Sequence, residues 1–325
     1  MNRLSPLRDA YEREGYVVVR KLLDNETLTV LAEKVMQQLL HHRIADGFTH
    51  RGQPRFTEPA QPDADLLKFV DVMRSELTEV LFQAPAVIEV MKVLLDTDEV
   101  FVHPVKWVRG LAPLDSSLHC SPGVHQDFPE LQGSDRQITL WAPFFNVDES
   151  SGSLPVYNKK PGETLLPLEL ALNPSGWQVC PQVLGTKNVF ELQPGDVLLF
   201  NTFTPHGGAT NTGEGWRCSI EARFQPLADP LALSNFAKPL LTQDWQTFYE
   251  GWHTWGFYWK DRHPPLTPFD PSWEQWRDLT AIGEAVKGNK NAVAALEIAA
   301  KFGVSEPVRS CAQRLLESFE CSYDQ

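Results

Sequence analysis

One stretch of the chain, PGDVLLFNTFTPHGG at residues 194–208, carries a turn, a buried strand and a histidine. The Pro-Gly-Asp triplet predicts a tight turn, because glycine and proline favour turn conformations. The apolar run after it predicts a buried strand over residues 196–203. This strand delivers His206 where the chain breaks into Gly207 and Gly208. We therefore expect His206 to be held at a strand end.

The next predicted strand, residues 216–224, alternates between two kinds of side chain. Its apolar positions are Trp216, Cys218, Ile220, Ala222 and Phe224. Its polar positions are Arg217, Ser219, Glu221 and Arg223. Successive side chains of a strand point to opposite faces of a sheet, so this strand has one apolar and one polar face.

The segment GVHQDF at residues 123–128, earlier in the chain, also has the character of a strand. His125 and Asp127 are two residues apart, so both are expected to leave the same face. Short strands separated by Gly, Pro, Asn and Asp indicate an antiparallel sandwich or barrel. The candidate strands of this β region are residues 100–109, 122–128, 137–146, 152–157, 188–192, 196–203 and 216–224.

The residues before the β region predict flanking helices. A helix that starts at Ser5-Pro6 ends at Gly15, a β-branched strand covers residues 16–19, and a second helix starts after Asp24. Residues 46–65 contain three prolines and no periodicity, and they are a candidate lid over a site. Helical spacing returns over residues 66–95.

The residues after the β region form an extension that a β core does not require. Six of the ten tryptophans lie between residues 245 and 276, where packing of a tail onto the core is the simplest interpretation. Two closing helices are predicted, near residues 290–302 and from Ser305 onward. We therefore expect a core over residues 1–226 and a Trp-rich, helical extension over residues 227–325 that packs on it.

Composition excludes several classes of function. The 325 residues have a formal net charge of −13, which argues against nucleic acid or an anionic membrane as partner. No run of 18 apolar residues occurs, and the polar residues 1–15 do not resemble a secretory signal, so we expect a soluble, cytoplasmic protein. The five widely spaced cysteines indicate no disulfide framework. The sequence does not decide the oligomeric state.

His125, Asp127 and His206 together make a candidate metal site. Two imidazoles and one carboxylate on a rigid β scaffold form the facial triad of non-haem Fe(II) oxygenases. A solvated His-Asp pair, or a zinc hydrolase with similar ligands, is the competing interpretation. Arg217 suits recognition of a diacid co-substrate, with Ser219 on the same face, although an ion pair with Glu221 or Glu191 is the alternative for this arginine.

Several motifs in this order resemble the phytanoyl-CoA dioxygenase family of Fe(II)/2-oxoglutarate oxygenases. They are HQD at 125–127, PGD at 194–196, His206, Arg217 eleven residues later with Ser219, and TLWAPFFNVDESSGSLPV at 139–156. The resemblance covers about residues 5–226. It implies a double-stranded β-helix, a jelly-roll fold, with helices flanking the sheets. One departure is the loop at residues 159–164, KKPGET, where many relatives have Pro-Gly-Ser-His near the substrate mouth.

Carried over to this chain, the resemblance assigns roles to particular residues. His125, Asp127 and His206 would bind Fe(II), and Arg217 with Ser219 would hold the distal carboxylate of 2-oxoglutarate. Weaker candidates for the 2-oxoglutarate pocket are Gln137, Thr139 and Trp141, and Lys106 is weaker still.

The resemblance implies oxidation of an unactivated C–H bond of a small molecule by O2, coupled to decarboxylation of 2-oxoglutarate to succinate and CO2, in secondary metabolism or elsewhere. Asp127 completes the ligand set, which favours hydroxylation over halogenation, while desaturation and ring formation stay open. The alternatives are a non-catalytic jelly-roll protein that binds a metal or small ligand, and an interaction protein that acts through residues 227–325.

Overall fold

The computed structural model describes residues 5–61, 69–159, 162–237, 239 and 244–321. A six-stranded antiparallel sheet is its centre, and the strand β12 pairs with three neighbours. The strands of this sheet, in spatial order, are β1 (Tyr16–Val19), β11 (Val197–Asn201), β6 (Ile138–Pro143), β12 (Arg217–Pro226) and β4 (Val100–Val102), with β5 (Trp107–Leu111) also on β12.

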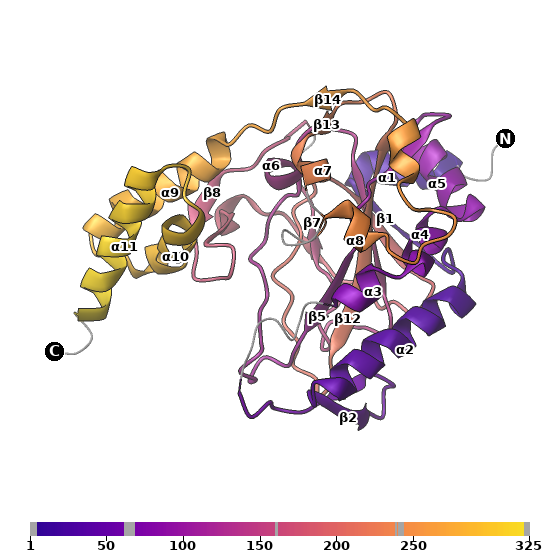
Figure 1. The fold of residues 1–325 in the computed structure, drawn as a ribbon, viewed down its shortest axis with the longest axis horizontal. Coiled ribbons are helices and arrows are strands. Elements are labelled where there is room, and N and C mark those ends of the chain that lie inside the picture. The colour runs from indigo at the N-terminus through magenta and orange to yellow at the C-terminus, as the bar shows by residue number, and fades with distance from the viewer. Residues whose placement is uncertain (1–4, 62–68, 160–161, 238, 240–243, 322–325) are drawn as a thin grey trace.

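Five helices from the N-terminal part cover one face of this sheet (Figure 1). They are α1 (Ser5–Glu14), α2 (Asn25–His41), α3 (Val70–Met73), α4 (Glu76–Phe82) and α5 (Pro85–Leu95). The apolar positions of β12, among them Ile220 and Phe224, join Leu31 and Val35 of α2 in one buried cluster. The predicted apolar face of β12 therefore faces the helices, and its polar face turns into the β core.

A second, less regular layer lies against the other face of the sheet. Its regular pairing includes β7 (Val156–Tyr157) with β10 (Lys187–Asn188). Single β-bridges join other segments of this layer: His125 with His206, Val156 with His206, Val147 with Leu192 and Ser151 with Asn211. Two antiparallel layers with helices outside them confirm the predicted mainly β, double-stranded β-helix core.

The region 122–128 is not the strand that the sequence suggested. His125 makes one bridge, and a short helix, α6 (Phe128–Leu131), follows directly, with Asp127 as its helical N-cap residue. The candidate strand 152–157 likewise shrinks to Val156–Tyr157 in β7, and only Asn188 of the candidate strand 188–192 lies in β10. These segments lie in the layer held by single bridges, where regular pairing is short.

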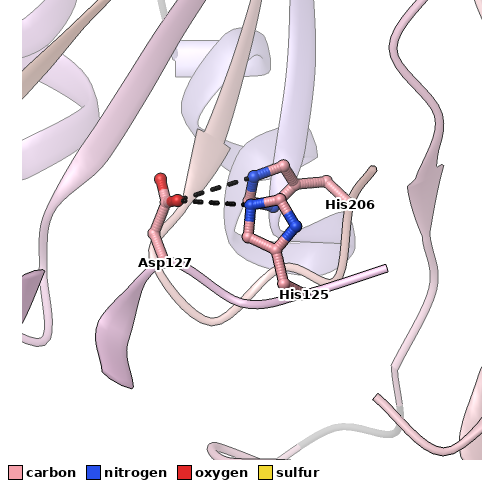
Figure 2. Close-up of side chains that lie close together, drawn as sticks. All are labelled: His125, Asp127 and His206. Carbon is pink, nitrogen blue, oxygen red and sulfur yellow. Dashed lines mark ion pairs between the residues drawn. The ribbon is translucent and has the colours of Figure 1, made fainter. Parts of the chain in front are cut away.

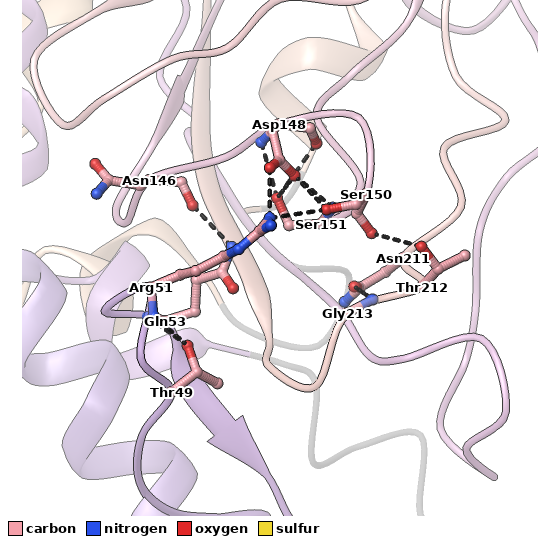
Figure 3. Close-up of polar contacts among 10 residues, drawn as sticks. All are labelled: Thr49, Arg51, Gln53, Asn146, Asp148, Ser150, Ser151, Asn211, Thr212 and Gly213. Carbon is pink, nitrogen blue, oxygen red and sulfur yellow. Dashed lines mark hydrogen bonds and ion pairs between the residues drawn. The ribbon is translucent and has the colours of Figure 1, made fainter.

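The candidate lid over residues 46–65 is largely a hairpin instead, as far as the described residues reach; residues 62–65 lie outside them. It consists of β2 (Ala45–Phe48) and β3 (Pro54–Phe56). Arg51 Nη1 lies 2.5 Å from Asp148 Oδ2, and the Gln53 amide donates to Asn146 O (Figure 3). Trp216 N donates to Pro54 O, so the hairpin closes the end of the core at which β12 begins.

The Trp-rich segment is fastened to the core through specific contacts. The Trp252 indole donates to Arg74 O, and the Tyr258 hydroxyl donates to Val102 O. The Glu76 carboxylate accepts from three successive backbone N–H groups of residues 253–255. Buried Lys106 binds Glu79 of α4 and lies near the Tyr258 hydroxyl, and none of the predicted co-substrate residues contacts it. Lys106 therefore anchors this segment, and its weak assignment to the co-substrate pocket stays a prediction.

As far as the chain is described, three helices close it and not the predicted two. They lie together at the C-terminal end of the molecule (Figure 1). They are α9 (Ser272–Val286), α10 (Val293–Phe302) and α11 (Glu306–Cys321). They share an apolar cluster rich in alanine, which also takes in Leu170. Leu170 belongs to a hairpin of the core made of β8 (Leu168–Leu170) and β9 (Trp177–Val179), so the helices are not an isolated pair.

Short elements connect these parts. They are η2 (Pro181–Val183), β13 (Leu231–Ala232), α7 (Ser234–Ala237), α8 (Trp245–Phe248), η3 (Tyr258–Asp261), β14 (Leu266–Thr267) and η4 (Lys290–Ala292). Among the described residues, no helix combines the length and apolar character needed to cross a bilayer.

Candidate metal centre and co-substrate pocket

Three predicted ligands converge at one point in the β core. His125 and His206 exchange backbone hydrogen bonds of 2.8 and 2.9 Å, which places their side chains next to each other. Asp127 Oδ1 lies 3.9 Å from His125 Nε2 and 3.6 Å from His206 Nε2. Figure 2 shows one carboxylate oxygen facing both imidazoles. The three donor atoms lie within 4.8 Å of one another, which fits a single ion.

Both histidines are oriented for metal binding by their other ring nitrogen. His125 Nδ1 lies 2.9 Å from Gly123 O, and His206 Nδ1 lies 2.9 Å from Thr204 O. A carbonyl oxygen can only accept a hydrogen bond, so each Nδ1 carries the proton and each Nε2 offers a lone pair. Burial, and then the neighbouring His125, lower the pKa of His206 to about 4. His206 is thus neutral at pH 7, as a metal ligand must be.

Asp127 is ionised and fixed through its second oxygen. Burial alone would raise its pKa, but the Arg223 guanidinium and then the two histidines hold the pKa well below its usual range. The Thr139 hydroxyl donates to Asp127 Oδ2 at 2.6 Å, and Arg223 Nη2 lies 3.6 Å from the same atom. Oδ1 is left facing the histidines. A neutral N2 and anionic O donor set of this kind suits Fe(II).

The opening of this centre is on the side of His125. The His125 side chain is 20% exposed, whereas those of Asp127 and His206 are each 6% exposed. The ring centroid of Trp177, on β9, lies 6.4 Å from that of His125. The most exposed of the three ligands is therefore His125, beside the β8–β9 hairpin.

Arg217 is a buried cation without a carboxylate partner in the described part of the chain. Its Nη1 donates to Ser219 Oγ at 2.8 Å and its Nε donates to Gly152 O at 3.2 Å. Burial lowers the pKa of Arg217 to about 10, which leaves it charged at pH 7. A buried charge costs several kcal/mol unless an opposite charge compensates it. Arg217 is therefore a candidate partner for an anion.

The alternative ion pair of Arg217 with Glu221 is not formed. Glu221 Oε1 lies 3.0 Å from Arg109 Nη2 and 3.0 Å from Arg223 Nη1. The sequence showed Glu221 and Arg223 on the polar face of their strand, but it did not connect them to the metal ligands. The signal available was the alternation itself, which placed both side chains on the face that carries Arg217.

The three weaker candidates on β6 and just before it lie in different surroundings. Trp141 is buried under Arg217, with the guanidinium carbon 5.8 Å from the ring centroid. Thr139 is bound to the carboxylate of Asp127. The Gln137 amide donates to Gln132 O, and its buried Oε1 has no hydrogen-bond partner among the described residues. Their contact with a co-substrate stays a prediction.

Comparison with known proteins agrees with this geometry. The chain is 25% identical over 235 residues to 1-deoxypentalenic acid 11-beta-hydroxylase of Streptomyces arenae, an alignment that covers 66% of this chain and 79% of that enzyme. The corresponding enzyme of Streptomyces exfoliatus is 24% identical over 233 residues, with the same coverage. No family model matches the chain.

Among solved structures, the chain resembles the epimerase SnoN, determined in complex with Fe3+, α-ketoglutarate and nogalamycin RO. The match has a TM-score of 0.51 at 19% identity and covers 74% of this chain and 92% of SnoN. A likeness at this level of identity establishes the fold. SnoN is a non-haem, α-ketoglutarate-dependent epimerase. This chain shares its jelly-roll fold.

Proposed function

We propose that this chain is a non-haem Fe(II)/2-oxoglutarate-dependent hydroxylase of a small molecule. Its reaction would insert one oxygen atom of O2 into an unactivated C–H bond and the other into succinate, as 2-oxoglutarate loses CO2. The observation that carries the proposal is a converged His-Asp-His set together with buried Arg217, which has no carboxylate partner in the part of the chain that is described. The similarity to two curated hydroxylases supports it.

The chain's own residues would do three things in that reaction. His125 Nε2, His206 Nε2 and Asp127 Oδ1 would hold Fe(II), which with 2-oxoglutarate and O2 supplies the oxidising chemistry. Arg217, with Ser219 beside it, would bind the distal carboxylate of 2-oxoglutarate. The burial of this arginine excludes water, which strengthens a charge-assisted hydrogen bond.

Trp141, Thr139 and Gln137 would support that arrangement from the strand next to β12. Trp141 packs under the Arg217 guanidinium and limits how far it can turn. Thr139 keeps Asp127 in place. The unpartnered Oε1 of Gln137 is a free acceptor inside the core. These roles favour a phytanoyl-CoA dioxygenase-like enzyme, whose catalytic core we place at residues 1–226.

A non-catalytic binding protein with the same fold is a weaker account of these residues. Such a protein needs a set of metal ligands but no second site for an anion. The buried charge of Arg217 would then destabilise the fold without contributing to binding. A zinc hydrolase leaves Arg217 equally unexplained. Both alternatives predict no decarboxylation of 2-oxoglutarate.

We propose that the substrate approaches through the cavity beside the ligand loops, and that residues 227–325 form part of its wall. This cavity of about 370 Å³ is lined by Gly123 and Gly208, each two residues from a histidine ligand, and by Gln178 of β9. Asn291 of η4 also lines it. Uncharged polar side chains, among them Gln178 and Asn291, form part of its lining beside apolar ones. Such a lining suits a substrate with hydrogen-bonding groups.

Release of succinate tests the proposed reaction. The purified chain with Fe(II), 2-oxoglutarate and O2 is expected to form succinate slowly without substrate and faster with a substrate. Zn(II) in place of Fe(II), or the variant Arg217→Gln, is expected to abolish this. Arg109→Gln is the matched control, because it removes one positive charge from the same sheet at a half-exposed position. Succinate release that equals the metal-free background would contradict the proposal.

The substrate cavity has its own test in the same assay. Asn291→Trp fills the cavity and is expected to abolish stimulation by a substrate while leaving the slow background unchanged. Val286→Trp, at a position 72% exposed on α9, is the control. Stimulation that survives Asn291→Trp would place the substrate elsewhere.

A further inference from the structure

The two carboxylate oxygens of Asp127 have different contacts. Oδ1 faces His125 Nε2 and His206 Nε2. Oδ2 is turned away from them and accepts from Thr139, with Arg223 Nη2 at 3.6 Å. A carboxylate can bind a metal through one oxygen or through both. The structure favours the one-oxygen mode, because Oδ2 is already occupied.

Arg223 lies between two buried carboxylates. Its Nη1 is 3.0 Å from Glu221 Oε1, in ion-pair contact but off the direction of a hydrogen bond. Glu221 in turn accepts a hydrogen bond of 3.0 Å from Arg109 Nε. Asp127, Arg223 and Glu221 are each more than nine-tenths buried, whereas the Arg109 side chain is half exposed. The charges therefore alternate from the metal centre to the surface.

We propose that Arg223 is a positioning residue that holds Asp127 as a one-oxygen metal ligand, and that Glu221 holds Arg223 in place. This inference rests on the proposed function. One-oxygen binding matters there, because a facial triad leaves three of six positions open and a second carboxylate oxygen would take one of them. Arg223 is not a co-substrate ligand in this account. Its partners are carboxylates of the chain itself, whereas no described carboxylate pairs with Arg217.

Charge alone predicts a different outcome from positioning, so variants can separate them. Loss of a cation beside a metal site would by itself tighten metal binding, since like charges repel. Loss of the residue that orients a ligand typically weakens binding 10- to 100-fold. Arg223→Lys keeps the charge but not the planar, forked geometry that reaches both carboxylates.

The experiment is a titration of the metal-free chain with Mn(II), followed by the EPR signals of free and bound metal. Arg223→Gln and Arg223→Lys are each expected to weaken Mn(II) binding about 10- to 100-fold and to change the spectrum of the bound ion. Arg109→Gln removes a positive charge at the solvent-exposed end of this series of charged residues. It is expected to bind Mn(II) as the parent does.

A second variant allows the inference to be tested even if the first one does not fold. If Arg223→Gln does not fold, the double variant Arg223→Gln/Glu221→Gln removes both charges of the pair and is expected to show the same weakening. Unchanged or tighter binding by Arg223→Gln, with Arg223→Lys equal to the parent, would overturn the inference and leave the proposed function standing. A parent chain that binds no Mn(II) would count against the proposed function itself.

Discussion

The guanidinium of Arg217 lies over the ring of Trp141, 5.8 Å from its centroid, with Ser219 Oγ 2.8 Å from Nη1. β12 supplies the arginine and the serine, and the neighbouring strand β6 supplies the ring. The ring contact and the hydrogen bond both orient the guanidinium, which would prepare it for the proposed anion. Such preorganisation lowers the entropy cost of binding.

Replacement of Arg217 is expected to weaken 2-oxoglutarate binding more than metal binding. A hydrogen bond to a charged group contributes about 1.5 to 3 kcal/mol, so Arg217→Gln should lower the affinity for 2-oxoglutarate about 10- to 100-fold. Calorimetric titration of the Mn(II)-loaded chain measures this. Arg109→Gln should bind 2-oxoglutarate as the parent does, and an equal loss in both variants would mean that only net charge matters.

Replacement of Thr139 is expected to act through Asp127. Thr139→Val keeps the shape of the side chain and removes the 2.6 Å hydrogen bond to Asp127 Oδ2. We expect Mn(II) affinity to fall about tenfold, within the range typical of residues that orient a metal ligand. Thr139→Ser keeps the hydroxyl and should restore most of the affinity. If instead 2-oxoglutarate affinity falls while Mn(II) affinity does not, Thr139 belongs to the co-substrate pocket.

Asp196 is expected to stabilise the turn before β11 in a pH-dependent way. Burial opposes its ionisation, but Gln193 N–H, Arg20 and Lys21 N–H donate to it and hold its pKa below the ordinary value. Its stabilisation is therefore complete above about pH 4, the pKa of an unfolded aspartate, and is lost as the pH falls further. Asp196→Asn should lower the free energy of unfolding at pH 7 by about 1 to 3 kcal/mol.

Urea unfolding at pH 7 and pH 3 measures this effect. The difference in stability between the parent and Asp196→Asn should shrink at the lower pH. A difference that stays constant with pH would show that shape, and not charge, is what Asp196 contributes.

A glycine in the β8–β9 hairpin is expected to control the docking of the C-terminal helices. Gly176 has φ +74°, and a Cβ there would lie 2.6 Å from the Cα of Ala295 on α10. Gly288 has φ +80° with open space around it, so it carries the backbone strain alone. Gly288→Ala should cost about 1 kcal/mol, and Gly176→Ala clearly more, because the backbone of α10 must also move.

Thermal unfolding compares these two glycine variants, and limited proteolysis of residues 272–321 locates the effect. Equal melting temperatures and equal cleavage would contradict a tight contact between the hairpin and the helices.

The regular part of the fold could be predicted from the sequence. Strict alternation of apolar and polar side chains along a strand shows which of its two faces packs against the helices. β12 is the clearest case, with Ile220 against the helices and Arg217 inside the core. The second layer was not predictable in this way. His125 and His206 meet through a single bridge, and Asp127 starts a helix, so the ligands converge for a reason other than strand alternation.

Two other features needed the three-dimensional structure. The buried residues of α9 are two alanines and two charged residues, which give a weak hydrophobic pattern: Arg277, Asp278, Ala281 and Ala285. Arg223 reaches Asp127 from a position 96 residues later in the chain, and no local motif signals such a pair. The candidate ligands themselves were recognisable because residue type and order carried the signal. Their roles with metal and co-substrate stay predictions until they are measured.

Anaerobic titration of the metal-free chain with Fe(II) and then 2-oxoglutarate tests the central claim most directly. A visible charge-transfer band should appear when both are present, disappear in His206→Ala, and require far more 2-oxoglutarate in Arg217→Gln. Absence of the band in the fully reduced parent chain would contradict the account, and a non-catalytic metal- or ligand-binding protein would then be the better description.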